Sequence, residues 1–129
     1  MTNSQDLKFE DLFSDNGAFD ERSILSCLHP LVIIQKETNK IFFKDAKLTA
    51  RQKILAYGLA KKLLKHKGLV DSETITAIEV YTAGDMPRGT VDVTFKQLRD
   101  DRILIGKIKY EIPGHQVSRV IKFLTSNNK

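Results

Sequence analysis

The chain has 129 residues, of which 41% are apolar, enough for one core of ordinary domain size and too few for two. Its single cysteine, Cys27, excludes an intramolecular disulfide, and no His/Cys set has the spacing of a metal site. No run of about 18 apolar residues predicts a membrane span, and residues 1–6 lack the features of a secretory signal. We therefore expect a cytoplasmic protein without a metal or other cofactor.

The net charge of +5 is unevenly distributed along the chain. Residues 1–45 hold five Lys/Arg against eight Asp/Glu, whereas residues 46–129 hold sixteen against eight. A basic segment of this kind favours a polyanionic partner, although many basic domains bind nothing anionic.

The N-terminal third predicts two short helices followed by a β-hairpin. Apolar residues recur at helical spacing over 7–13 and 19–28, within an acidic extension that we place at residues 1–30. Two runs of β-branched or aromatic residues, 31–34 and 41–43, flank a polar loop and predict a hairpin over 31–43.

A long amphipathic helix is predicted over residues 49–67. Thr49 and Gln52 have the spacing of a capping box at its start, and Gly68 follows at the position where a helix ends. Its polar face is rich in lysine and could contact a phosphate backbone or simply be solvated; the candidate residues are Lys61, Lys62 and Lys65.

The rest of the chain predicts two helices, a hairpin and a final helix. Residues 74–82 could form a strand by propensity, but the context favours a helix that begins near Asp71, with Ile75 and Ile78 facing inward. Pro87 opens the next helix, where Val91, Phe95 and Leu98 form the buried stripe. Strands over 103–105 and 108–112 enclose a tight turn at 106–107, and a helix over 115–124 follows.

Residues 48–113 resemble the winged helix-turn-helix of bacterial and archaeal transcriptional regulators. The residues that match that pattern without a gap are Glu79, Val80, Met86, Pro87, Gly89, Thr90, Val91, Phe95, Leu98, Asp100, Asp101 and Ile103. Two positions depart from it: Gly84 stands where a large apolar residue is usual, and Asp85 stands at the turn glycine. Aspartate tolerates a positive φ better than most residues, so the turn can still form. The resemblance implies an α+β domain over 31–129, with three helices and a short β-hairpin wing.

The same resemblance implies a double-stranded DNA partner and a non-enzymatic regulator or genome-associated factor. The residues expected to face the groove are Arg88, Thr90, Val93, Lys96 and Gln97, and in the wing Lys107 and Lys109. Asp92 and Asp100 would oppose phosphates, and an exposed Val93 suits a protein surface. The alternative is therefore a winged-helix adapter that binds another protein instead of DNA.

Three further expectations concern the remaining segments. Val117, Val120, Ile121 and Leu124 of the final helix could form a homodimer seam or pack back onto the N-terminal hairpin. The acidic segment 1–30 could fold over the basic face and inhibit binding. His29, His66 and His115 are dispersed, and no glycine-rich phosphate loop is present, so we do not expect an enzyme.

Overall fold

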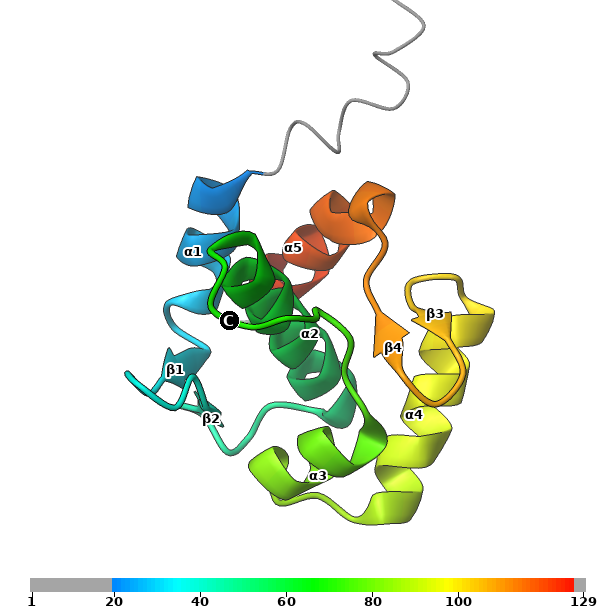
Figure 1. Cartoon of the computed structure of the whole chain (residues 1–129). Coiled ribbons are helices and arrows are strands. Elements are labelled where there is room, and N and C mark those ends of the chain that lie inside the picture. The colour runs from blue at the N-terminus through cyan, green and yellow to red at the C-terminus, as the bar shows by residue number, and fades with distance from the viewer. Residues whose placement is uncertain (1–19, 127–129) are drawn as a thin grey trace, which may run out of the picture.

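The computed structural model of this protein describes residues 20–126 (Figure 1). In chain order the elements are α1 (Glu21–Leu28), β1 (Val32–Ile34), β2 (Ile41–Phe43), α2 (Ala50–His66), α3 (Ala77–Gly84), α4 (Arg88–Asp100), β3 (Ile105–Gly106), β4 (Tyr110–Glu111), the 3-10 helix η4 (Gly114–Gln116) and α5 (Val117–Ser126). The predicted α+β class is confirmed. The helix predicted over 7–13 lies outside the described residues, and none of the helices within 20–126 is long and apolar enough to cross a membrane.

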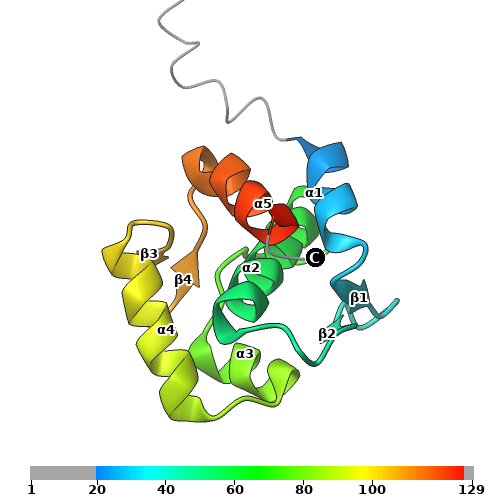
Figure 2. The ribbon, with the colours of Figure 1, turned by 180° about the vertical axis from the view of Figure 1, so that it is seen from behind.

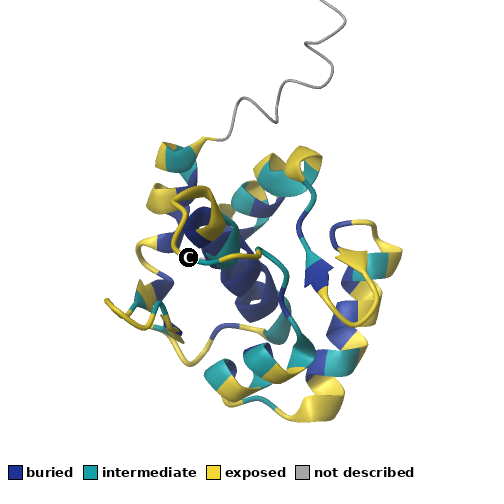
Figure 3. Ribbon diagram, viewed as in Figure 1, coloured by how far each residue is buried: buried dark blue, intermediate teal, exposed yellow. Residues whose placement is uncertain are grey.

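Helix α2 forms the centre of the fold. The predicted capping box is present, because the Thr49 hydroxyl accepts from the Gln52 amide at 3.1 Å and the Gln52 side chain accepts from the Thr49 amide at 2.8 Å. The helix ends at His66, and Gly68 adopts a φ of 75°, as its predicted role requires. Every residue from Gln52 to Ala60 is buried, which is visible as the dark centre of Figure 3.

Helices α1 and α5 pack on α2 from the two ends of the chain (Figure 2). Ile24 of α1 is fully buried, so the described part of the predicted extension belongs to the same core as the rest of the chain. In α5, Val120 and Leu124 are also buried, whereas Val117 and Ile121 are half-buried. Two of the four residues predicted for a dimer seam are thus buried within the chain, where α5 packs on α1 and α2.

The predicted N-terminal hairpin is confirmed as an antiparallel pair. The register matches Val32 with Phe43, Ile33 with Phe42 and Ile34 with Ile41. Val32 and Ile41 face the core, while the Ile33 and Phe42 pair faces outward. Strand β2 also contacts α3, so the hairpin supports the helix that precedes α4.

Helix α3 begins six residues later than predicted. Thr76 caps it with Glu79 in a second capping box, and the residues before Thr76 are extended. Ile75 is fully buried, as expected, but as a strand-like residue that exchanges backbone hydrogen bonds of 2.7 and 2.8 Å with Tyr110. The prediction that Ile78 faces inward is wrong, because the later start turns this side chain outward, where it is 62% exposed.

The turn between α3 and α4 forms with Asp85 in place of glycine. Asp85 has a φ of 52°, and the amide of Met86 donates to the carbonyl of Tyr81 at 3.1 Å. Helix α4 then presents the predicted stripe to the core, with Val91, Phe95 and Leu98 all buried. The aspartate therefore serves as the left-handed residue that ends α3.

The second hairpin is shorter than predicted. Strands β3 and β4 have two residues each, and the connecting loop is Lys107, Ile108 and Lys109 instead of a tight turn at 106–107. Gly106 adopts a φ of 120°, where a side chain would collide with the Lys109 carbonyl. The centres of the Phe95 and Tyr110 rings lie 4.5 Å apart, and this contact holds the hairpin against α4.

The contacts around Gly84 explain why a large apolar residue is absent at this position. Gly84 is buried, and a Cβ atom there would lie 2.9 Å from the Met86 methyl group and 3.1 Å from the Lys53 stem. The Lys53 ammonium is buried as well and donates to the Gly84 carbonyl at 2.9 Å. The lysine stem fills the space that a larger side chain at Gly84 would occupy. Its ammonium supplies a hydrogen bond and a positive charge to the carbonyl groups at the C-terminal end of α3.

We predict that Gly84→Leu, which restores the usual apolar side chain, lowers the free energy of unfolding by about 1–3 kcal/mol because it overpacks this site. The measurement is urea unfolding monitored by circular dichroism. Gly89→Ala is the matched control, since no atom lies within 4 Å of its added Cβ, and it should leave stability unchanged or slightly higher. Equal stability of the two variants would contradict this packing account.

Candidate nucleic-acid interface

The side of α4 opposite its buried stripe is exposed and mixed in character. Pro87 precedes the helix, and Arg88, Thr90, Val93, Lys96 and Gln97 are all exposed, as the sequence predicts for this surface. The Arg88 side chain is 74% exposed and lies 3.8 Å from the Asp92 carboxylate one turn later. Val93 is 55% exposed in the middle of this surface. The five exposed side chains are thus two cations, one hydroxyl, one amide and one apolar group.

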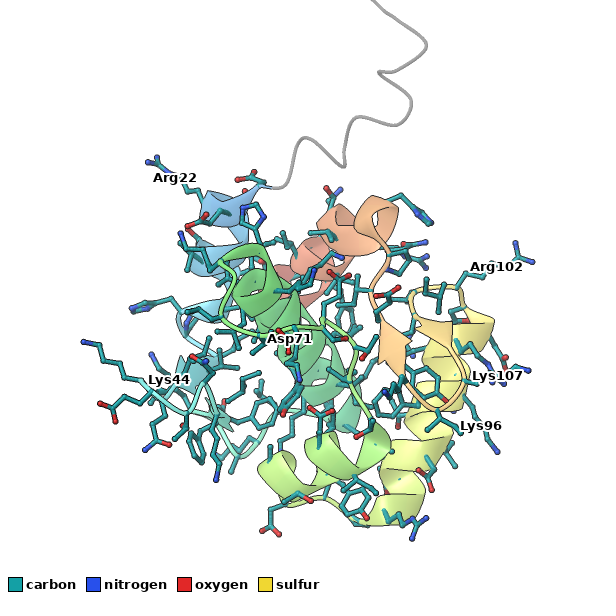
Figure 4. The ribbon with its side chains drawn as sticks, in the orientation of Figure 1. Arg22, Lys44, Asp71, Lys96, Arg102 and Lys107 are labelled. Atoms are coloured by element: carbon teal, nitrogen blue, oxygen red, sulfur yellow. The ribbon has the colours of Figure 1, made fainter. Side chains whose placement is uncertain are left out.

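The β3–β4 loop adds two further cations on the same side. Figure 4 shows Lys96 and Lys107 projecting from α4 and from this loop in a common direction, away from the body of the protein. Lys107 and Lys109 are both exposed, and Ile108 between them is 81% exposed. A loop tip of two lysines around an isoleucine therefore extends beside the exposed side of α4.

Arg102 also belongs to this surface, although no sequence pattern predicts it there. It follows α4 with a φ of 64° and projects on the same side as Lys96 and Lys107 (Figure 4). Because Arg102 lies two residues after the last residue of α4, helical periodicity gives no signal for it. Its left-handed backbone conformation begins the path from α4 into β3.

The segment 88–110 carries more positive than negative charge. It contains six Lys/Arg and three Asp, and two of these aspartates have cationic partners. Asp101 pairs with Arg51 of α2 at 3.0 Å, and Asp92 lies near Arg88. We call the exposed side of α4, Arg102 and the loop Lys107–Lys109 the α4 surface; its charge favours an anionic partner.

The three lysines predicted on α2 have different surroundings. Lys61 forms a 3.0 Å ion pair with Glu79, the capping residue of α3, and Lys62 forms a 2.6 Å ion pair with Glu73. Both pairs are partly buried. The first connects α2 to α3, and the second connects α2 to the segment that leads into α3. Within residues 20–126, Lys65 is exposed and has no hydrogen-bond or ion-pair partner. Of the three, Lys65 is the one whose charge is available to another molecule.

A carboxylate pair lies beside Lys62. Burial, followed by the charge and hydrogen bonding of Glu73, raises the pKa of Glu111 in β4, and Lys62 opposes this rise. The pair joins the strand that carries the loop Lys107–Lys109 to α2. Its electrostatics therefore affect how firmly the hairpin is held.

We predict that Glu111→Gln raises stability relative to the wild type more at pH 7 than at pH 4. Because the folded protein raises the pKa of Glu111, its contribution to stability is fully present below pH 4.5 and is lost as pH rises through the folded-state pKa. Urea unfolding of both proteins at the two pH values measures the difference. A stability difference that is constant or larger at pH 4 would contradict the raised pKa.

Within 20–126, no group of three or more His, Cys, Asp or Glu side chains is placed to hold a metal ion. Compared with models of protein families, with curated proteins and with solved structures, the chain matches none of them.

Proposed function

We propose that this protein is a winged helix-turn-helix DNA-binding protein that inserts α4 into the major groove of a DNA duplex. Helices α2, α3 and α4 would be the three helices of that fold. Ile75, β4 and β3 would be its small sheet, because Ile75 pairs with Tyr110 and β4 pairs with β3. The loop Lys107–Lys109 would be the wing.

The observation that supports this proposal best is that side chains of α4 and of the wing project on the same side of the protein. Arginine and glutamine can hydrogen-bond base edges in pairs, and Arg88 and Gln97 are exposed on α4. Lysines hold phosphates without reading sequence, and Lys96, Lys107 and Lys109 are exposed on or beside the same helix. One surface thus combines side chains suited to base edges with side chains suited to phosphates.

The dimensions and polarity of α4 fit a groove. Its 13 residues span about 20 Å, and the major groove is about 12 Å wide and admits one helix. Pro87 and Arg88 begin the helix in the open, so its first amides and the positive end of its dipole face solvent. Phosphates on the edge of the groove would be attracted to this end.

A protein partner is the second candidate for the same surface, and Val93 favours it. This side chain is 55% exposed at the centre of the α4 surface, with Asp92 and Asp100 on the same helix. An adapter that uses these residues would bind its partner with little dependence on salt, whereas binding to DNA falls steeply as salt rises. The salt dependence of binding therefore separates the two functions.

We predict that the protein binds a mixed-sequence DNA duplex with a log–log salt slope of about −4 to −5, because about four to six of its cations would contact phosphates. Fluorescence anisotropy between about 50 and 200 mM salt measures this slope. Arg88→Glu/Lys96→Glu should weaken binding at least about ten-fold and reduce the size of the slope by about two.

The matched control is Lys36→Glu/Lys40→Glu, which makes the same change of charge in the β1–β2 loop, on the opposite side of the molecule from α4 (Figure 1). This control should bind nearly as well as the wild type. Equal losses in the two double variants would show that net charge alone drives binding. Absence of binding at the lowest salt would overturn the proposed function and favour the adapter.

A further inference from the structure

A pocket of about 130 Å³ has a lining that shares no residue with the α4 surface. It is formed by the first turns of α2, by α5 and by the segment after α4, and Figure 2 shows α5 lying across α2 there. The residues that line it are Arg51, Leu55, Ile103, Arg119, Val120 and Phe123. Four of these side chains are apolar and two are arginines.

The apolar residues form the floor of the pocket. Leu55 and Val120 are each 1% exposed and Ile103 is 6% exposed, so they belong to the core and hold the pocket in a fixed shape. Phe123 is half-buried and packs against the same core. An apolar group of a ligand would therefore meet a preformed apolar surface.

The two arginines give the pocket its positive charge. Arg119 is exposed, and within the described part of the chain it has no acidic partner. Arg51 binds Asp101 through one nitrogen at 3.0 Å, and its guanidinium carbon lies 5.9 Å from the centre of the Phe123 ring. A guanidinium has five N–H donors, so Arg51 can keep this pair and still donate to a second anion.

We propose that this pocket binds a small carboxylic acid whose apolar body is about the size of a benzene ring. An apolar cavity of about 150 Å³ accommodates benzene, which sets the size of the body. The carboxylate would accept hydrogen bonds from Arg119 and Arg51, since guanidinium–carboxylate pairs are among the strongest polar contacts. The ring or branched chain would lie on Leu55, Ile103 and Val120.

The test is an NMR titration of the ¹⁵N-labelled full chain with sodium benzoate at constant ionic strength. We expect saturable shifts of the backbone amides of Leu55, Ile103 and Val120, with a dissociation constant on the order of 1 mM for a ligand of this size. Arg119→Gln should weaken binding about ten-fold. Lys122→Gln removes the same charge from the exposed side of α5, outside the pocket lining, and should leave the affinity unchanged.

Benzyl alcohol and sodium phosphate separate the two parts of the proposal. The alcohol keeps the ring without the charge, and phosphate keeps a charge without the ring, so both should bind at least about ten-fold more weakly than benzoate. If phosphate binds as tightly as benzoate, the pocket is a simple anion site. If benzyl alcohol binds as tightly as benzoate, the arginines do not contribute to binding. Either result, or shifts that do not saturate, would overturn the proposal. Failure here leaves the DNA proposal intact, because the pocket floor shares no residue with the α4 surface.

Discussion

Helix α2 is buried on all sides between Gln52 and Ala60, and the other elements are arranged around it. Helices α1, α3, α4 and α5 and the β1–β2 hairpin all contact it, so it has no side left for solvent between Gln52 and Ala60. This explains the buried Lys53, whose apolar stem packs in the core while its ammonium satisfies the Gly84 carbonyl. One unusual pair of residues, a buried lysine and a glycine, thus sets the end of α3 and the start of the path to α4.

The position of the α4 surface follows from a second set of contacts, centred on Glu79. This carboxylate caps α3 through Thr76, pairs with Lys61 of α2 and accepts a 3.4 Å hydrogen bond from the Tyr57 hydroxyl. Burial and the nearby Glu79 charge raise the pKa of Tyr57 to about 12, so the phenol stays protonated and can donate. On the other side, Ile75 ties the hairpin to the chain before α3. Both parts of the surface are therefore anchored to α2 or to the segment beside it.

Sequence patterns located most elements because the signals were local and strong. The capping pair of Thr49 and Gln52, and the stripe through Phe95, depend on residues within one or two turns. The start of α3 could not be predicted, because the β-branched residues before Thr76 suit both a helix and a strand. The pairing of Ile75 with Tyr110, which is distant in the sequence, makes this segment extended. The ion-pair partners of Lys61 and Lys62 could not be predicted for the same reason, because the two glutamates lie 18 and 11 residues away in the sequence. Periodicity predicts which side of α4 is exposed. That Lys107 lies on the same side as this exposed face can be seen only in the folded structure.

If α4 and the loop Lys107–Lys109 together contact DNA, as proposed, a short duplex added to the ¹⁵N-labelled chain should shift the backbone amides of both segments in an NMR titration. We expect the largest shifts between Arg88 and Gln97 and at Lys107–Lys109, and no change at the outward residues Ile33 and Phe42 of the first hairpin. Largest shifts on the β1–β2 hairpin, with α4 unaffected, would mean that α4 does not contact DNA.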